Sequence, residues 1–261
     1  MALEYRHEFK YVVSRIEIAC LRSRIQSIME LDSHTGDKNV YQIRSLYFDD
    51  YKNTCFYENE EGTSPREKFR IRIYDSSPEV IHLELKQKNR GKTHKDSCTL
   101  TKGECDAILN GRLRWKAAAL VLPGDETGGA ETGGAETGGA EAKQRAVLHK
   151  FFLQQETRRL EPKVIVEYER EPYVYRNGNV RVTFDTDIRS SSAKNRFFEE
   201  RIPARPVMPV GYHLMEVKYD EFLPDHIYRA LQLENLRLST FSKYYLCRKY
   251  NMGGINNYGI Q

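Results

Sequence analysis

The chain has 261 residues, of which 39% are hydrophobic and 30% are charged, and its formal net charge is +4. The apolar share is enough for a folded core, and the charge is far below that of a histone-like nucleic-acid binder. No stretch approaches the roughly 18 apolar residues of a membrane helix, and residues 1–6 lack the apolar region of a signal peptide. We therefore expect a cytoplasmic protein with no membrane span in this chain, and we exclude a secreted precursor and a fibrous protein.

The cysteines predict neither a zinc cluster nor a disulfide framework. Their number is odd, their spacings are wide, and no CxxC pair occurs. The five cysteines are Cys20, Cys55, Cys98, Cys105 and Cys247. We expect all of them to be reduced thiols.

One segment differs from the rest of the chain in composition. The sequence ETGGA occurs three times in succession over residues 126–140, without a large apolar side chain. Such a segment cannot bury enough surface to offset the entropy of ordering. We expect a flexible, low-complexity insert at about 124–142, within a single domain that spans residues 1–261.

Helix signals are few. Two capping boxes, Ser14 with Glu17 and Thr101 with Glu104, each predict the start of a helix. Further helices are predicted over Lys143–Arg159, from Pro224 to about Leu236, and as a short segment from Thr240.

Most of the remaining chain has the composition of β-strands. Eight segments are rich in β-branched and aromatic residues. They are Glu4–Val12, Val40–Phe48, Glu67–Tyr74, Val80–Lys88, Lys95–Thr101, Lys163–Arg170, Val180–Asp185 and His213–Tyr219. Because few connections are long enough for crossover helices, we expect an α+β fold with a mainly antiparallel sheet or barrel.

These strands alternate apolar residues with charges of particular kinds. Lys68, Arg70 and Arg72 share one face of their strand, because side chains alternate with a period of two. A glutamate and a lysine two residues later recur on three strands. These pairs are Glu8 with Lys10, Glu84 with Lys86, and Glu216 with Lys218.

Two arrangements can accommodate such strands. One is a sheet with a solvated charged face. The other is a closed barrel with a polar lumen, in which the repeated spacing has a purpose. Convergent Lys and Arg need an anion, and phosphate oxygens suit both side chains. The carboxylates can bind Mg²⁺ or Mn²⁺ that bridges phosphate oxygens. The pattern thus favours a metal-assisted triphosphate or polyphosphate site.

The ordered set of motifs is similar to a known family. It comprises Arg6-x-Glu8-x-Lys10, residues 69–74, residues 83–86, residues 180–187, residues 215–218 and residues 241–243. The first motif resembles the ExExK signature of triphosphate tunnel metalloenzymes. The whole set, from about Glu4 to Tyr250, resembles the polyphosphate-polymerase domain of vacuolar transporter chaperone (VTC) complexes.

This resemblance implies an eight-stranded antiparallel tunnel with helices packed outside. It implies an ATP:polyphosphate phosphotransferase that uses Mn²⁺ or Mg²⁺, with ATP and inorganic polyphosphate as partners. Residues carried over as triphosphate- and product-binding are Lys10, Arg70, Arg72, Lys86, Lys95, Arg170, Arg181, Lys218, Ser242 and Lys243. Glu216 would be the metal ligand, and Glu8 a secondary candidate for metal binding or for orienting the lysines.

Several residues also fit ordinary structural roles. Arg6 replaces the first glutamate of ExExK, which removes one possible metal ligand and fits the polymerase branch better than the hydrolytic or cyclase branches. Lys95 and Lys243 fit solvated surface positions, and Arg170 an exposed strand end. Asp185 could assist a metal or begin a turn.

Other functions stay open at this stage. They are a triphosphatase or nucleotide-processing enzyme on the same scaffold, and a non-catalytic polyphosphate-binding module. RNA binding is disfavoured by the modest charge and the absence of an RNP-like aromatic motif. Metal preference, product length, oligomeric state and a membrane-protein partner are not determined by the sequence.

Overall fold

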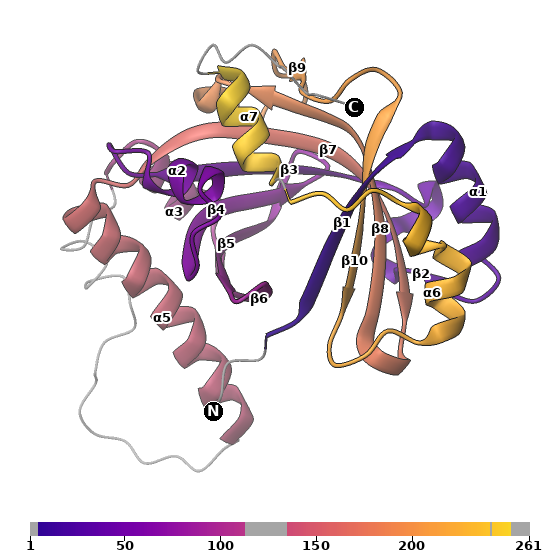
Figure 1. Cartoon of the computed structure of the whole chain (residues 1–261). Helices are drawn as coiled ribbons and strands as arrows, with labels where there is room; N and C mark the ends of the chain where they lie inside the picture. The colour runs from indigo at the N-terminus through magenta and orange to yellow at the C-terminus, as the bar shows by residue number, and fades with distance from the viewer. Residues whose placement is uncertain (1–4, 113–134, 241, 252–261) are drawn as a thin grey trace.

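The capping boxes and the alternating segments form helices and strands close to the expected positions. The computed structural model describes residues 5–112, 135–240 and 242–251. Ser14 and Thr101 both cap helices, and the glutamate three residues later accepts a hydrogen bond from the cap's own N–H in each case. The fold is α+β, with a curled antiparallel sheet (Figure 1).

The elements follow one another along the chain as follows. They are β1 (His7–Ser14), α1 (Arg15–Ile25), β2 (Glu30–Leu31), η1 (Ser33–Lys38), β3 (Tyr41–Asp49), α2 (Thr54–Glu60), β4 (Arg66–Tyr74), β5 (Ser77–Asn89), β6 (Lys92–Leu100), α3 (Lys102–Leu109), α5 (Ala135–Arg158), β7 (Glu161–Tyr175), η2 (Asn177–Asn179), β8 (Val180–Ser191), η3 (Lys194–Arg196), β9 (Arg205–Pro206), β10 (Tyr212–Tyr219), α6 (Asp225–Leu231), η4 (Leu233–Asn235) and α7 (Lys243–Asn251).

Eight strands form the main path of the sheet, in the order β1-β10-β8-β7-β3-β4-β5-β6. Every pairing along this path is antiparallel. The two end strands meet at a bridge just before β1, where the backbones of Arg6 and Thr93 exchange two hydrogen bonds of 2.8 and 2.9 Å. The curled sheet is thus joined at one rim, which gives its concave face the shape of a tunnel.

Helices cover the convex face in two groups. Helices α1 and α6 pack on β1, β10 and β8 through residues such as Ile18, Ile227 and Phe184. Helices α3 and α5 cover β3 to β6 with Phe151 and Phe152 in contact with the outward side chains of those strands. The burial of these apolar faces leaves the charged faces turned inward.

One helix, α7, packs on the inward face of the sheet instead of the convex face. Tyr244 and Leu246 of α7 pack with Ile43, Val166 and Tyr168. These three residues lie on the inward face, which they share with Ser45 and Arg72. The inward face therefore carries an apolar section under α7, and this section positions α7 so that its first residue, Lys243, enters the charged part.

Element bounds differ from the expected ones where tertiary contacts extend a segment. Strands β7 and β8 run on to Tyr175 and Ser191, because they pair with each other over most of their lengths. Helix α2 was not predicted, and α6 ends at Leu231 rather than near Leu236. Helix α5 includes residues 135–142, where we predicted a loop, and residues 124–134 of that loop lie outside the described residues. In the part of the chain that is described, no helix is both long and apolar enough to cross a membrane.

Candidate functional site

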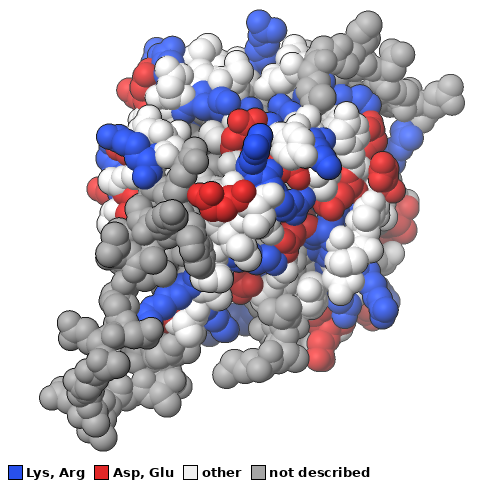
Figure 2. All heavy atoms as spheres, turned by 90° about the vertical axis from the view of Figure 1, so that its left-hand side faces the viewer, with Lys and Arg blue, Asp and Glu red and all other residues white. Residues whose placement is uncertain are grey.

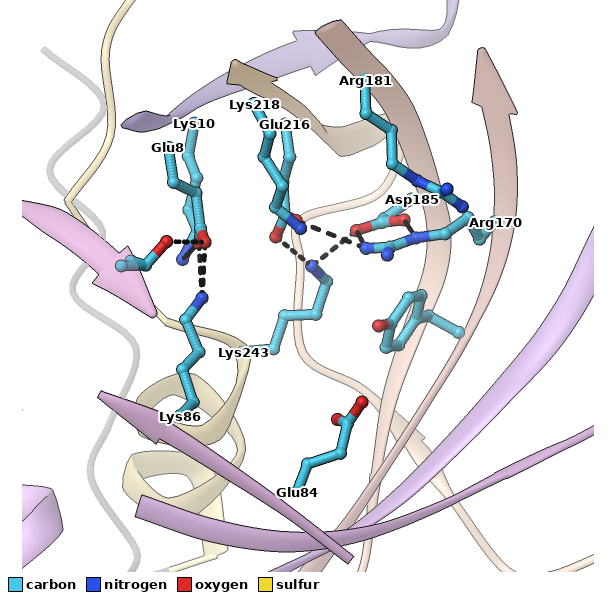
Figure 3. Close-up of polar contacts among 12 residues, drawn as sticks. Glu8, Lys10, Glu84, Lys86, Arg170, Arg181, Asp185, Glu216, Lys218 and Lys243 are labelled. Carbon is cyan, nitrogen blue, oxygen red and sulfur yellow. Dashed lines mark hydrogen bonds and ion pairs between the residues drawn. The ribbon is translucent and has the colours of Figure 1, made fainter. Parts of the chain in front are cut away.

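The predicted charged residues of the strands lie on β1, β4, β5, β6, β7, β8 and β10. Figure 3 shows how those from β1, β5, β7, β8 and β10 meet Lys243 inside the curled sheet. Register places Lys10 opposite Glu216 and Glu8 opposite Lys218 on β1 and β10. On β4 and β5, Arg70 lies opposite Glu84. At these positions a cation therefore lies opposite a carboxylate, which favours their contact across the strands.

Glu216 lies at the centre of one cluster and is 5% exposed. Its Oε1 accepts a hydrogen bond from Lys243 Nζ at 2.7 Å, and its Oε2 lies 3.1 Å from Lys218 Nζ. Arg170 Nη2 lies 3.4 Å from the same Oε2. Burial acts to raise the pKa of Glu216, but Lys243, Lys218 and Arg170 together hold it well below its usual range. Glu216 is therefore an ionised carboxylate that organises three cations.

Asp185 joins this cluster from β8. Arg170 donates from Nε and Nη2 to its two carboxylate oxygens, both at 2.7 Å, and Lys243 Nζ lies beside Oδ2. Arg170 is 6% exposed, so the alternative of an exposed strand end is wrong. Against the opposing effect of burial, Asp185 and then Glu216 raise the pKa of Lys243, which keeps it charged.

Glu8 forms a second cluster, near the rim where the sheet closes. Lys86 Nζ reaches both of its oxygens, at 2.7 and 2.6 Å, and Thr93 Oγ1 donates at 3.3 Å. Lys10 Nζ lies 3.3 Å from Oε1 of Glu8. Burial lowers the pKa of Lys86, and the attraction of Glu8 opposes this effect. Repulsion by Lys10 and Lys218 lowers the pKa further, to about 7. Lys86 therefore titrates near neutral pH, whereas Glu8 stays ionised.

Glu84 forms a third cluster, on β5, and is completely buried. It accepts hydrogen bonds from Arg70 Nε at 2.6 Å and from Lys95 Nζ at 2.8 Å, and Arg72 Nη1 lies 3.7 Å away. The alternation placed Glu84 on the charged face, but we assigned it no role. Its importance follows from register, because β4 and β6 both bring cations to it.

The described clusters carry more positive than negative charge. Eight cationic side chains contact four carboxylates, which leaves a surplus of four positive charges when all are ionised. These carboxylates are Glu8, Glu84, Asp185 and Glu216. They hold the cations in place, and the surplus favours a multiply charged anion.

Lys68 is a ninth cation on the same face, and we did not include it in the predicted site. Its Nζ lies over the rings of Tyr47 and Tyr244, 5.9 and 5.5 Å from their centroids. Among the described residues, no carboxylate forms an ion pair with Lys68. Burial, and then Lys86 and Lys10, keep its pKa well below its ordinary value. An anion that binds beside Lys68 would relieve this repulsion.

Cavities lie at two ends of the charged region. One, of about 220 Å³, is lined by basic residues that include Lys10, Arg66, Lys68, Lys86 and Lys88. The other, of about 640 Å³, is lined by Tyr41, Tyr74, His82, Arg181, Asp32 and neighbouring residues. We name them the lysine cavity and the tyrosine cavity.

Three predicted site residues lie at the margins of this arrangement. Arg181 is at the tyrosine cavity, where its guanidinium lies 2.6 Å from Asp32 and 3.1 Å from the Tyr41 hydroxyl. The side chain of Lys95 is half exposed. Ser242 lines the lysine cavity, but its hydroxyl accepts a hydrogen bond from the Tyr245 N–H at 3.1 Å and so caps α7.

The carboxylates do not form a metal cage by themselves. Over residues 5–112, 135–240 and 242–251, no three His, Cys, Asp or Glu side chains lie together as a metal site. Glu216 and Glu8 fit a divalent ion only if phosphate oxygens complete its ligands, which is the usual way that proteins bind Mg²⁺. The residues therefore suit a metal ion that is bound together with a phosphate chain.

Comparison with known proteins identifies the family. The model of the VTC domain matches residues 5–251, so the chain belongs to the VTC domain family, as the motifs indicated. Among solved structures, a Bacillus halodurans protein described as a candidate adenylate cyclase is 16% identical, with a TM-score of 0.43 over 90% of this chain and 89% of its own. The PH1819 protein of Pyrococcus horikoshii is 12% identical, with a TM-score of 0.45 over 94% and 99%. A search of curated proteins found no match.

Proposed function

We propose that this member of the VTC domain family transfers the terminal phosphate of ATP to the end of an inorganic polyphosphate chain inside the tunnel. The observation that carries the proposal is the surplus of positive charge around Glu8, Glu84, Asp185 and Glu216. Such a site matches a polyphosphate chain, because every phosphate along the chain carries negative charge. The broad outer face that carries α5 has no comparable excess, since Lys and Arg are interspersed there with Asp and Glu (Figure 2).

The reaction requires positioning and charge stabilisation more than covalent help from the protein. In phosphoryl transfer, charge accumulates on the equatorial oxygens while the attacking and leaving oxygens stay in line. Arg70 and Arg72 offer guanidinium groups from neighbouring positions of β4, and Lys243 and Lys218 offer ammonium groups across the tunnel. These groups are fixed by carboxylates before substrate arrives, so little reorganisation is needed during reaction.

The acceptor does not require a general base. The terminal phosphate of a polyphosphate chain is already ionised near neutral pH. Its oxygen attacks the γ-phosphorus of ATP, the bond from that phosphorus to the β,γ-bridging oxygen breaks, and ADP leaves with the electron pair. The chain grows by one phosphate without a proton transfer to the protein.

Glu216, with Glu8 as a second ligand, would hold Mn²⁺ or Mg²⁺ against the phosphate oxygens. When bound, the metal supplies additional charge neutralisation on the transferred group. The ammonium groups that now contact Glu216 would then turn toward phosphate, because each lysine has a flexible four-carbon chain.

A second candidate is a module that binds polyphosphate without turning over ATP. It is favoured by the finding that the four buried carboxylates of the described tunnel are all engaged by cations and form no cluster of metal ligands. A hydrolase on the same scaffold is the remaining alternative, and products distinguish all three.

The test is an incubation of the purified protein with ATP and Mn²⁺, with and without a short polyphosphate primer. Polyphosphate would be resolved on a gel and ADP release measured in parallel. Long polyphosphate with matching ADP supports the polymerase. ADP with free phosphate supports the hydrolase, and binding without turnover supports the module.

Matched variants assign the activity to the tunnel. Arg72→Met removes an inward charge that is 7% exposed, and Lys102→Met removes an outward charge on α3. We expect the first variant to lose most activity and the second to retain it. Equal activities in a folded pair would place the reaction outside the tunnel.

A further inference from the structure

Three lysines lie side by side across neighbouring strands. Register places Lys68 of β4 opposite Lys86 of β5, and Lys86 opposite Lys95 of β6. Like charges directly opposite each other destabilise a sheet, so each ammonium group in this row is stabilised by a carboxylate beside it. Lys86 contacts Glu8 (Figure 3), and Lys95 contacts Glu84. Among the described residues, no carboxylate forms an ion pair with Lys68, so its positive charge is the uncompensated one of the row.

The aromatic rings around Lys68 replace only part of a counter-ion. Its Nζ lies 5.9 Å from the centroid of the Tyr47 ring and 5.5 Å from that of Tyr244. Both distances are near the limit of about 6 Å at which a ring attracts a cation. Burial, and then the charges of Lys86 and Lys10, hold the pKa of Lys68 well below its ordinary value. The neutral amine, whose lone pair can react, is therefore far more accessible at Lys68 than at a solvated lysine.

We propose that Lys68 is a site of reversible carbamylation, at which its side-chain amine combines with CO₂. The lone pair of Nζ attacks the carbon of CO₂, an N–C bond forms, and the electron pair of one C=O bond moves onto oxygen. The nitrogen then releases a proton to water, so a neutral lysine and CO₂ give a negatively charged carbamate and a proton. Nothing is oxidised or reduced. The inference goes beyond the proposed function, because it does not depend on ATP turnover.

The surroundings of Lys68 suit the carbamate better than the ammonium group. Lys68 lines the lysine cavity, whose volume of about 220 Å³ has room for the atoms that CO₂ adds. Because the carbamate is negative, the repulsion by Lys86 and Lys10 becomes attraction. Glu8 and Glu58 also line this cavity, but both oxygens of Glu8 already accept hydrogen bonds from Lys86.

The other two lysines of the row do not offer this environment. Lys86 donates to Glu8, and Lys95 donates to Glu84. A carbamate on either lysine would place a second negative charge beside a carboxylate, which opposes the reaction. We therefore expect carbamylation at Lys68 and not along the whole row.

Carbamylation changes the charge that a phosphate chain meets in the tunnel. A bound polyanion favours the ammonium form of Lys68, whereas CO₂ consumes the neutral amine and leaves a negative charge. The two ligands therefore oppose each other, and each weakens the binding of the other by the same factor. We expect saturating CO₂ to weaken tripolyphosphate binding about tenfold, which is within the usual range for coupled sites.

The first test traps the carbamate on the unmodified protein. The protein would be equilibrated with isotope-labelled CO₂ and bicarbonate in a mildly alkaline buffer, and then treated with triethyloxonium, which ethylates the carbamate and makes it stable. Peptide mass mapping should find the labelled ethoxycarbonyl group on Lys68. Lys102, an exposed lysine of α3, is the internal control and should stay unmodified. An unlabelled Lys68, or equal labelling of Lys68 and Lys102, would overturn the proposal.

The second test measures whether the modification controls anion binding. Tripolyphosphate would be titrated by calorimetry with and without CO₂ at constant ionic strength. Lys68→Arg keeps a cation at this position, but a guanidinium group stays protonated and forms no carbamate. We expect Lys68→Arg to lose the effect of CO₂, each measurement being referred to the same variant in CO₂-free buffer. Lys102→Arg should keep the wild-type response.

The outcomes separate the proposal from its rivals. A CO₂ effect of equal size in the wild type and in Lys68→Arg would mean that bicarbonate competes as an ordinary anion, and this would contradict the proposal. Tripolyphosphate should in turn reduce the trapping of label on Lys68. A protein that traps the carbamate but binds no tripolyphosphate would support carbamylation and refute the proposed function, so the two failures are distinguishable.

Discussion

At the scale of single residues, Glu216 determines how three cations share the centre of the tunnel. Glu216→Gln keeps the shape of the side chain but removes its charge, so a divalent ion loses a ligand and Lys243 and Lys218 lose their anchor. We expect turnover to fall by about 10²-fold or more. Polyphosphate should still bind, because the net positive charge of the tunnel increases. ADP release and a polyphosphate-binding titration measure the two effects.

Glu169→Gln is the matched control, since Glu169 is exposed and lies on the face of β7 opposite to that of Arg170. We expect this variant to behave as the wild type. Normal Mn²⁺-dependent turnover by Glu216→Gln would remove Glu216 from the metal site.

Lys86 gives the site a dependence on pH. Its pKa of about 7 means that it loses charge as the pH rises above neutrality. A bound polyanion favours the charged form, so the affinity for ATP should fall between about pH 7.5 and 9, where the γ-phosphate is already ionised. One linked proton corresponds to at most about tenfold per pH unit.

Calorimetry in buffers of different ionisation enthalpy should show proton uptake on binding over the same range. Lys86→Met should flatten the profile. It should not abolish it, because burial also lowers the pKa of Lys68 and Lys218 on neighbouring strands. A variant with the full wild-type slope would show that Lys86 does not titrate in this range.

At the scale of elements, one buried carboxylate connects β3, α2 and α7. Asp49 accepts hydrogen bonds from the N–H groups of Cys55 and Phe56 at the start of α2, and from the hydroxyl of Tyr244 on α7. It is completely buried. The residue before Tyr244 is Lys243, so this joint fixes the helix that brings a cation into the tunnel.

Tyr244→Phe removes one hydrogen bond to a charged group and leaves the ring in place. We expect a loss of about 1.5–3 kcal/mol in the free energy of unfolding, measured by urea denaturation. Activity should fall further than the small change in folded population explains, because Lys243 is less firmly held. Tyr245→Phe removes an exposed contact with Glu60 and should cost less than about 1 kcal/mol. Equal stabilities of the two variants would show that the joint is not important.

The inward face was predictable where the pattern is local to one strand. Alternation along a strand fixes the face of each side chain. Lys10, Lys86 and Lys218 point inward (Figure 3), and so do Arg70 and Arg72, which contact the inward Glu84. Arg6, which departs from the ExExK signature, lies at the bridge that joins the sheet and pairs with Asp220.

The partners of these residues could not be predicted, because they depend on register between distant strands. Asp185 meets Arg170 across β8 and β7, and nothing in either strand's own sequence identifies that pair. Arg44 is a similar case on the outward face. It is completely buried and donates to Glu167 and to the carbonyls of residues 197, 199 and 200. The place of helix α7 on the inward face was also not predictable, because apolar and charged residues share that face.

At the scale of the whole molecule, the repeat segment should contribute little to the fold or the tunnel. Helix α5 begins at Ala135, and from residue 141 onward its first buried side chain is Val147, since residues 141–146 are exposed. Its anchoring residues, Phe151 and Phe152, pack on β3 to β6 beyond the repeats. Deletion of residues 124–142 with a short Gly-Ser joint should therefore leave activity within about twofold and the unfolding free energy within about 1 kcal/mol.

Phe151→Ala is the control that shows what loss of the α5 anchor would cost. This side chain is fully buried against Phe48 and Phe69, so we expect about 3–5 kcal/mol of destabilisation. Urea denaturation and the primed polyphosphate assay would be run on both variants. If the folded deletion loses most of its activity while its stability is unchanged, the segment takes part in the reaction, because its loss would then act on substrate and not on the packing of α5.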